Sequence, residues 1–352
     1  MNFDFNDEQR AIKDSARDLL ASRYPLEEVR RLATDDDQGF TDAQWDEFVS
    51  LGWPGIFVAE EHGGQGLGIV ELVILQEEMG YAVAPSPFFS NAAAGLVLQA
   101  GASDEQKERW LAPLAAGELR GTLAMVRDDG TAQADGDALS GTWAAVPDAG
   151  SADVVIANDG ERHWAVAADA DGVAIEPTLG IDPTRKLFRV TLDGAPADAL
   201  PGDQDAMRPA HDAAATALAA ESVGVAQRAM EMAVEYAKDR KQFETPIGAF
   251  QAVSHRCAQM LLETEGARSA TYYAAWALDH EPSSGALATS MAKSYASDAG
   301  FRVPASSIQV HGGIGFTWEH DLHWFLKRGT ANAHAFGDAR WHRARVAELA
   351  GI

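Results

Sequence analysis

The sequence predicts a mostly helical α+β fold in three parts: an N-terminal helical domain over residues 1–119, a middle β-domain over 120–205, and a C-terminal four-helix bundle over 206–352. Apolar side chains recur at helical spacing in the first and last parts. Between them, short β-like runs are separated by turn dipeptides such as Asp135-Gly136 and Asp171-Gly172. Long stretches with few helix breakers, joined by short Gly/Pro turns, indicate antiparallel helices in the last part.

The first part is expected to begin with a helix that Asn6 caps. Its buried face carries Ile12, Ala16, Leu19 and Leu20. A second helix is expected from Asp42 and ends before Gly52 and Pro54, and a third covers 69–81. Ser103 with Gln106 has the spacing of a capping box, so another helix is predicted to start there.

The middle part is expected to hold strands over 122–126, 152–157, 163–168 and 188–192. A sheet of this size needs neighbours on at least one face. The last part is expected to hold helices over 213–238, 251–279, 285–301 and 338–349.

The net charge of the chain argues against two classes of partner. The 53 acidic and 28 basic residues give a formal net charge of −25. Such a surface repels phosphate backbones and anionic lipid headgroups, so neither nucleic acid nor a membrane surface is an expected partner. Because 46% of the 352 residues are apolar, the chain is long and apolar enough for a substantial core.

The single cysteine, Cys257, excludes an intrachain disulfide and a cysteine metal cluster, and it fits a reducing cytoplasm. The first ten residues are acidic and lack the apolar region of a signal peptide. No apolar run reaches the roughly 18 residues of a membrane span. A cytoplasmic protein is therefore expected.

Three segments resemble the acyl-CoA dehydrogenase family. Residues 240–251 read Arg-Lys-Gln-Phe-Glu-Thr-Pro-Ile-Gly-Ala-Phe-Gln, and residues 309–316 read Gln-Val-His-Gly-Gly-Ile-Gly-Phe. The glycine-rich stretch 51–68, beginning Leu-Gly-Trp-Pro-Gly, is similar to the N-terminal signature of the family. Because the order of the three parts also matches, the resemblance covers nearly the whole chain and implies the acyl-CoA dehydrogenase fold.

The resemblance implies an FAD site. In the family, the arginine, phenylalanine and last glutamine of the first segment contact the ADP half of an FAD that the neighbouring subunit mainly binds. A guanidinium can clamp a pyrophosphate with two hydrogen bonds, and glycines let a backbone approach a nucleotide closely. Taken alone, the segment would favour the interpretation of an exposed arginine beside a phenylalanine buried in the hairpin. The implied FAD contacts are Arg240, Gln242, Phe243, Gln251, Gln309, Gly312 and Gly313.

The catalytic carboxylate of the family has no clear counterpart. The reaction removes the α-proton of an acyl thioester while a hydride passes from the β-carbon to flavin, so it requires a base. The loop position that carries this base in many members aligns with Phe336-Gly337-Asp338. Asp338 lies two residues after Phe336, which takes the position of the base, and Asp338 is also a suitable helix N-cap. The alternative position aligns with Ala214, followed by Ala215, and Glu221 lies two turns further on. Asp338 and Glu221 are thus weak candidates.

The family's contacts to the flavin ring are also missing. The expected Thr-Glu-Pro-x-Ala-Gly-Ser-Asp pattern aligns with 124–131, which is shorter and reads Ala-Met-Val-Arg-Asp-Asp-Gly-Thr. The second ring segment aligns with 141–149, where Trp143 is expected in the core.

The resemblance therefore implies a subunit of an FAD-dependent acyl-CoA dehydrogenase that completes the FAD site of a longer partner subunit, which carries the catalytic glutamate. The shorter chains of bacterial α2β2 members, including those that shorten steroid side chains, show this asymmetry. Acyl-CoA is the implied substrate and an electron-transfer flavoprotein or similar protein the implied acceptor. No metal is expected, because His311, His320, His323 and His334 lack the spacing of a helical metal pair.

Two alternatives remain open. The chain could be a self-sufficient flavoenzyme with Asp338 or Glu221 as base, because nitroalkane oxidases resemble the family and use an aspartate near the loop position. It could also be a structural partner that binds no flavin.

Overall fold

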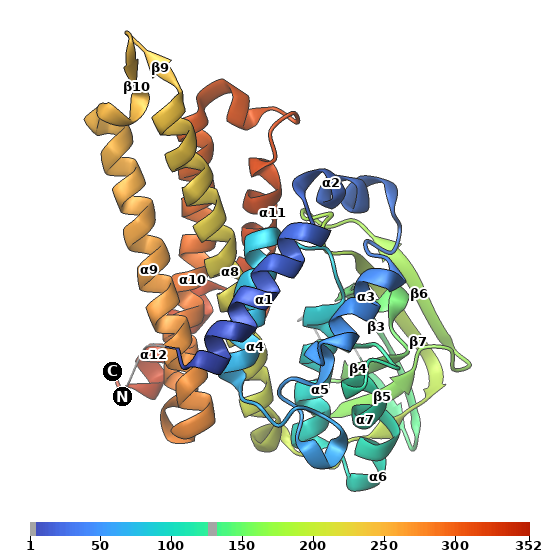
Figure 1. Cartoon of the computed structure of the whole chain (residues 1–352). Coiled ribbons are helices and arrows are strands. Elements are labelled where there is room, and N and C mark those ends of the chain that lie inside the picture. The colour runs from blue at the N-terminus through green and yellow to red at the C-terminus, as the bar shows by residue number, and fades with distance from the viewer. Residues whose placement is uncertain (1–4, 126–131) are drawn as a thin grey trace. The chain divides into compact units, whose positions relative to one another are not determined.

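The computed structural model describes residues 5–125 and 132–352, which adopt the mostly helical α+β fold expected from the sequence (Figure 1). The helices are α1 (Asp7–Arg23), α2 (Leu26–Asp35), α3 (Asp42–Ser50), α4 (Ile69–Ala82), α5 (Phe88–Gly101), α6 (Asp104–Gln106), α7 (Ala112–Ala115), α8 (Gln204–Asp239), α9 (Gln251–His280), α10 (Pro282–His311), α11 (Leu322–His334) and α12 (Ala339–Leu349). The strands are β1 (Gly121–Ala124), β2 (Gln133–Asp135), β3 (Ala138–Pro147), β4 (Val154–Asn158), β5 (His163–Ala167), β6 (Val173–Thr178), β7 (Leu187–Pro196), β8 (Asp198–Ala199), β9 (Lys241–Gln242) and β10 (Thr245–Pro246).

The chain forms two compact units. One combines Met1–Arg30, Ile69–Ala84 and Ala215–Ile352, and the other combines Arg31–Gly68 with Pro85–Ala214. No helix in the described ranges is long and apolar enough to cross a membrane.

The first unit is a helical bundle. Helices α8, α9 and α10 run side by side, and the short β9–β10 hairpin joins α8 to α9 at one end (Figure 1). The buried side chains between these helices are mostly small, as in the cluster of Ala219, Val223, Ala267, Ala296 and Ala299. Small side chains let the helix axes approach closely, so the helices of the bundle pack tightly against one another.

Gly224 in α8 marks the closest approach of α8 to α4. A Cβ added to Gly224 would lie 1.9 Å from the carbonyl oxygen of Glu77, and one added to Gly80 would lie 2.0 Å from that of Glu221. The two glycines therefore let two helix backbones touch, and Gly224 does not interrupt its helix.

Replacing Gly224 with alanine is expected to lower the free energy of unfolding by about 3 kcal/mol, because α4 and α8 must separate to admit the methyl group. The matched control is Gly266→Ala in α9. There the nearest atom to the new Cβ is the hydroxyl of Tyr295, at the end of a side chain that can move. Urea unfolding of both variants checks this, and equal stability of the two would contradict the close approach.

The same unit holds a cluster of buried charges on α4. Glu77 and Glu78 are 2% and 1% exposed. Lys13 of α1 contacts Glu77 at 2.9 Å and Glu78 at 2.8 Å, and Arg17 also pairs with Glu78. Arg268 of α9 lies 3.3 Å from Glu77. These pairs fix α1 and α9 against α4, because breaking a buried pair leaves an uncompensated charge.

The second unit contains two four-stranded sheets, ordered β1-β4-β5-β8 and β2-β3-β7-β6. Strand β1 pairs with β4 in parallel, and the other pairs are antiparallel. Their shared core includes Trp143, Val155, Trp164 and Val190. Trp143 is 3% exposed and donates its indole N–H to the Asn158 carbonyl, so its predicted place in the core is confirmed. Helix α5 supplies the expected neighbour, since the Asn91 side chain accepts from the Gly121 N–H of β1 at 2.9 Å.

Several predicted helix boundaries are confirmed, and others differ from the observed ones. Asn6 and Ser103 both form capping boxes at the predicted helix starts. Helix α8 begins at Gln204, nine residues before its predicted start, and α10 continues to His311 through Pro304. Strands β2, β3 and β6 were not predicted, because their alternation of buried and exposed positions is short or irregular.

The glycine-rich stretch 51–68 lies in the second unit, and several of its glycines have positive φ angles. Gly52, Gly63 and Gly66 have φ values of 70°, 79° and 65°. A Cβ on Gly64 would lie 2.1 Å from the Val58 carbonyl oxygen. The stretch therefore needs glycine for its own folding.

Candidate functional site

The β9–β10 hairpin presents the first family segment. Arg240 follows directly after α8, and Gln251 is the first residue of α9. The turn residues Phe243 and Glu244 have φ values of 52° and 63°, a conformation that costs non-glycine residues free energy. Phe243 is 88% exposed, so it is not buried in the hairpin. An exposed aromatic ring in a strained turn favours a binding role over a packing role.

The second family segment lies next to the first. Its His311 ring stacks on Tyr236 of α8 at a centroid distance of 4.4 Å and donates from Nδ1 to the Ser307 carbonyl. Tyr236 is one turn before Arg240, whose N–H donates to the Tyr236 carbonyl at 2.8 Å. The stacked pair therefore fixes the glycine-rich turn Gly312–Phe316 beside the end of α8.

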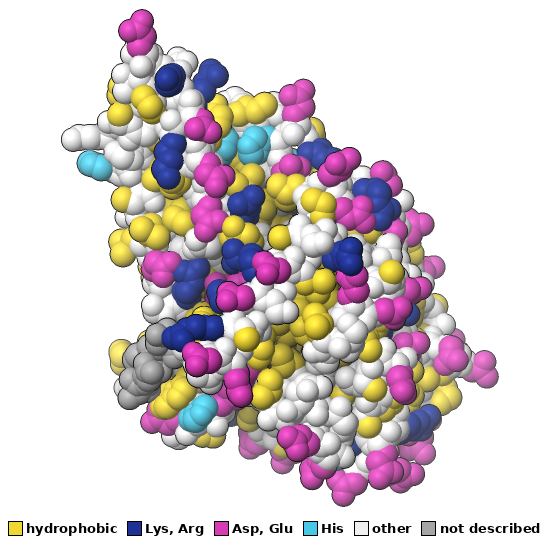
Figure 2. Space-filling model, viewed as in Figure 1, with side chains coloured by type: hydrophobic (Ala, Val, Ile, Leu, Met, Phe, Trp, Pro, Cys, Tyr) yellow, Lys and Arg dark blue, Asp and Glu magenta, His cyan; other side chains and the backbone are white. Residues whose placement is uncertain are grey.

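The polar groups of this end of the bundle fit a nucleotide. Arg240, Gln251 and Gln309 are exposed and make no side-chain hydrogen bond within the described ranges, whereas Gln242 donates to the Lys241 carbonyl at 2.8 Å. A Cβ on Gly312 or Gly313 would meet nothing within 4 Å. Figure 2 shows Lys and Arg side chains at this end of a strongly acidic chain. Free donors beside open glycine backbone suit the phosphates and ribose of an FAD.

Cys257 and the histidines near the glycine-rich turn have packing contacts. Cys257 is half-buried against the apolar cluster of Met230, Met260 and Val303, and burial raises the pKa of its thiol. A thiol with a raised pKa is a poor nucleophile. His311 and His320 lie edge to face, with ring centroids 4.6 Å apart. In the part of the chain that the structure describes, no group of three or more potential ligands could hold a metal.

Asp338 caps α12. Its carboxylate accepts the Trp341 N–H at 2.7 Å, and this backbone hydrogen bond lowers its pKa. A lower pKa makes the carboxylate a weaker base. Asp338 therefore has the N-cap role that its position before the helix predicted.

Replacing Asp338 with asparagine is expected to leave both stability and the turnover of the assembled enzyme unchanged, because asparagine caps helices equally well. Replacing it with alanine is expected to cost about 1 kcal/mol of stability. Thermal unfolding and an acyl-CoA-dependent dye-reduction assay check these outcomes. Loss of turnover in the asparagine variant alone would make Asp338 the base.

Glu221 is 1% exposed and is held by two side chains of α11. Its Oε1 accepts from Arg328 at 2.5 Å and its Oε2 accepts from the Asn332 amide at 2.9 Å. Arg328 is also 1% exposed. Because both carboxylate oxygens are engaged inside the bundle, these contacts favour a role in packing over proton abstraction.

The loop between α11 and α12 is fixed from inside the bundle. Phe336, at the family's base position, has a φ of 55°, and its carbonyl accepts from Nε2 of His342 at 2.9 Å. Lys293 is fully buried and donates to the carbonyls of Asn332 and Gly337, each at 3.0 Å. Burial lowers the pKa of Lys293 to about 7. These bonds hold a strained backbone in place, and the side chain at the family's base position is the apolar ring of Phe336.

Acid is expected to destabilise this loop through His342. Burial lowers the pKa of His342 to about 4, and the side chain is 1% exposed. Because the pKa in the unfolded chain is about 6.5, the unfolded state takes up the proton first as pH falls. Stability is therefore lost between about pH 6.5 and 4, by up to about 3 kcal/mol.

His342→Gln keeps a donor for the Phe336 carbonyl but does not titrate, so its stability should fall less over this pH range. Urea unfolding at several pH values measures the difference between the two proteins. An identical pH dependence would show that His342 does not contribute.

The other aligned positions are inert or outside the described residues. Ala214 and Ala215 are buried in α8, at 1% and 3% exposure. The first ring segment aligns with 124–131. Its first residue, Ala124, is the last residue of β1, and residues 126–131 lie outside the described residues. In the second ring segment, Asp148 has a φ of 53° and accepts from the Ser90 hydroxyl.

Comparison with known proteins agrees with the fold and the segments. The family model of the acyl-CoA dehydrogenase N-terminal domain matches residues 6–118, and that of the acyl-CoA dehydrogenase C-terminal domain matches 206–350. Acyl-CoA dehydrogenase IpdE2 of Mycobacterium tuberculosis is 32% identical and covers 95% of this chain and 94% of its own length. Acyl-CoA dehydrogenase FadE34 of the same organism is 36% identical, and this chain spans about half (48%) of its length.

Two solved structures are similar over nearly the full chain. The Tcur3481-Tcur3483 steroid ACAD G363A variant is 31% identical, with a TM-score of 0.90 and 98% of each chain covered. The ChsE4-ChsE5 complex from Mycobacterium tuberculosis is 25% identical, with a TM-score of 0.91 and coverage of 100% of this chain and 99% of the other. The chain therefore belongs to the acyl-CoA dehydrogenase family of FAD-dependent oxidoreductases.

Proposed function

We propose that this chain is the shorter subunit of a heteromeric acyl-CoA dehydrogenase and that it holds the ADP half of an FAD shared with a longer partner subunit. The observation that carries the proposal is an asymmetry within the chain. Exposed nucleotide-binding side chains surround the β9–β10 hairpin, whereas Phe336 occupies the loop position of the family's base. The two carboxylates considered as substitutes cap a helix and bind Arg328.

The residues named for FAD have separate tasks. Arg240 would clamp the pyrophosphate, and Gln251 and Gln309 would bind ribose or adenine edges. Gly312 and Gly313 would let the backbone lie against the nucleotide, and Phe243 would cover it from the hairpin turn. Bound FAD would supply the hydride acceptor for α,β-desaturation of an acyl-CoA thioester, with the base coming from the partner.

The comparisons support a heteromeric assembly and a bulky substrate. The ChsE4-ChsE5 structure is a complex of two components, and the Tcur3481-Tcur3483 protein is a steroid ACAD. FadE34, at about twice the length of this chain, has room for a second unit of similar size. We therefore propose an α2β2 assembly that acts on a steroid or similarly bulky acyl-CoA, with an electron-transfer flavoprotein or similar acceptor.

Purification of the chain with and without a longer acyl-CoA dehydrogenase subunit tests the proposal. Alone, it should carry far less than one FAD per chain and show no acyl-CoA-dependent dye reduction. Co-expressed with a longer chain that it binds, it should yield a yellow complex with turnover. One FAD per chain and full turnover by the isolated protein would instead establish a self-sufficient enzyme.

A further inference from the structure

Two histidines join strand β5 to the start of helix α8. His163 of β5 is 2% exposed, and its Nε2 lies 3.0 Å from Nε2 of His211 of α8. The two rings meet edge to face, with centroids 5.0 Å apart. Both residues belong to the second unit, and neither is among the residues proposed to bind FAD. The pair is therefore a buried titratable group that the proposed function does not use.

The pair fastens the β4–β5 hairpin to the first turns of α8. Trp164, the residue after His163, points into the core between the sheets, so His163 points to the opposite face of β5. On α8, Gln204 donates its side-chain amide to the Gly160 carbonyl at 2.9 Å, and His211 lies about two turns further on. The hairpin and the helix are thus joined by an exposed contact and by the buried histidine contact.

Asn158 determines which nitrogen of the pair is the acceptor. Its Oδ1 accepts the Gly160 N–H at 2.8 Å, so its amide nitrogen is the atom that lies 2.9 Å from Nε2 of His163. An amide nitrogen can only donate, so Nε2 of His163 must carry a lone pair. Nε2 of His211 is then a second donor to the same atom. These contacts assign His163 as neutral, with its proton on Nδ1.

The two histidines respond differently to acid. His211 can bind a proton at Nδ1 while its Nε2 continues to donate. A proton on Nε2 of His163 would face two donors with no acceptor left, so this contact must open. Burial and the neighbouring His211 lower the pKa of His163 to about 4, and burial lowers the pKa of His211. His163 is therefore the group whose protonation breaks the contact.

Few charges near the pair offset a proton on His163. Asp159 of the β4–β5 turn favours the charged form, but its carboxylate already accepts the Trp164 indole N–H and two backbone N–H groups. Strand β4 carries no charged residue, and Asp212 of α8 favours the charged form of His211 instead. The remaining charged side chains of the β4–β5 turn, β8 and the start of α8 are exposed or lie in ion pairs: Glu161, Arg162, Asp198, Asp203, Asp205 and Arg208.

We propose that the contact between His163 and His211 is an acid-sensitive latch that fastens the start of α8 to the β4–β5 hairpin. While His163 is neutral, its Nε2 binds both donors and the latch is closed. Protonation of His163 removes the acceptor, and the first two turns of α8 separate from the hairpin while the two sheets keep their fold. In the open form the histidines are hydrated and have the ordinary pKa of about 6.5. Opening is therefore favoured as pH falls from about 6.5 towards 4, and the latch is closed above that range.

Hydrogen exchange of the full chain, followed by mass spectrometry, measures this opening segment by segment. Between about pH 8 and pH 5.5, the protection of amides 208–214, corrected for the intrinsic exchange rate, should fall at least about ten-fold, because pH 5.5 lies one unit below the pKa of a hydrated histidine. Protection of strands β3 and β7 in the same unit should change much less. An equal fall in β3 and β7 would mean that the whole unit opens, and would overturn the latch.

Two substitutions of His163 separate the proton from the contact. His163→Gln keeps an acceptor for Asn158 and His211 but does not titrate, so most of the ten-fold fall should disappear. His163→Leu removes the acceptor, so amides 208–214 should be weakly protected at both pH values. His342→Gln, which removes a buried histidine from the other unit, is the matched control and should keep the wild-type response.

The latch is overturned if the wild-type segment keeps its protection at pH 5.5, or if His163→Gln loses protection as the wild type does. Exchange of β3 and β7 shows whether each variant is folded. If His163→Leu proves unfolded by that criterion, the comparison of the wild type with His163→Gln decides the question by itself.

Discussion

Replacing Arg328 with alanine is expected to destabilise the bundle by about 3–5 kcal/mol, a large share of the stability of a typical domain. Arg328 and Glu221 are each 1% exposed, and their side chains meet at 2.5 Å. Removal of the guanidinium leaves a buried carboxylate without its cationic partner, although the Asn332 amide still donates to it at 2.9 Å. Urea unfolding followed by circular dichroism measures the loss.

A compensating variant separates the charge effect from general damage. Glu221→Gln combined with Arg328→Met removes both charges while the glutamine carbonyl still accepts from Asn332. This double variant should recover most of the stability, because apolar or neutral replacements of buried ion pairs are often tolerated. In the assembled enzyme it should also keep turnover. Recovery of stability with complete loss of turnover would assign Glu221 a catalytic role.

Replacing Arg240 with alanine is expected to weaken ADP and FAD binding by about ten- to a hundred-fold, since hydrogen bonds to charged groups contribute about 1.5–3 kcal/mol each. Arg240 is exposed and directly follows α8, so its removal should not affect folding. The FAD content of the assembled complex should fall accordingly, measured from the flavin absorbance released on denaturation.

Lys241→Ala is the matched control for Arg240→Ala. It removes a positive charge from the next residue, which is also exposed, and side chains of successive extended residues point to opposite sides. Flavin content should therefore remain near that of the wild type. Equal losses in both variants would indicate a general electrostatic effect, and unchanged content in both would favour a structural partner without flavin.

Local capping signals predicted the starts of three helices. Asn6, Ser103 and Asp338 were each recognised as caps because a cap depends on residues within three positions, and all three cap their helices. The end of α10 was not predicted correctly. The helix expected over 285–301 continues to His311 as α10, with Pro304 buried within it. Tertiary packing outweighed local preference there.

The buried charges could not be predicted from the sequence. Glu221 had a position from which it could point inward, but its partner Arg328 lies 107 residues away. Glu77 and Lys13 are separated by 64 residues. Helical periodicity marks such residues as polar and therefore exposed, because it contains no information on distant partners.

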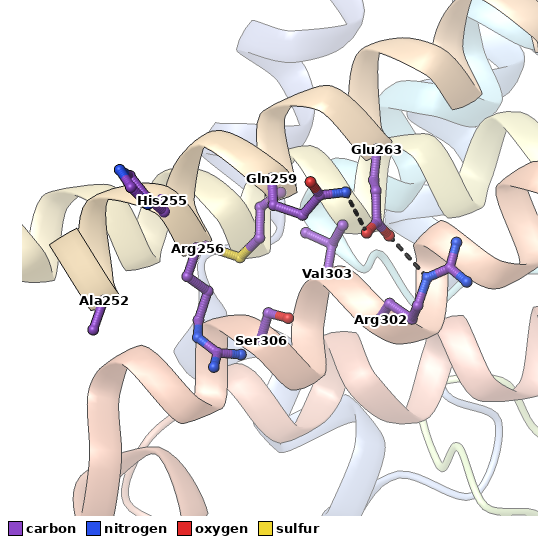
Figure 3. A pocket seen from close by; sticks show the side chains of 9 residues that line it. Ala252, His255, Arg256, Gln259, Glu263, Arg302, Val303 and Ser306 are labelled. Atoms are coloured by element: carbon purple, nitrogen blue, oxygen red, sulfur yellow. Dashed lines mark hydrogen bonds and ion pairs between the residues drawn. The ribbon is translucent and has the colours of Figure 1, made fainter.

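The FAD segments could be recognised in the sequence, whereas the pocket between α9 and α10 could not. The twelve residues from Arg240 form a contiguous motif, so their resemblance to a family could be recognised. Arg256 of α9 and Ser306 of α10 line the same pocket only after folding (Figure 3). No spacing rule within one helix connects them.

Binding of FAD, ADP and FMN to the isolated chain tests the shared-cofactor account most directly. If this subunit holds only the ADP half, FAD and ADP should bind with dissociation constants within about three-fold of each other, and FMN should not compete. Binding of FAD a hundred-fold or more tighter than ADP would show that the chain also holds the flavin ring, and would contradict the account.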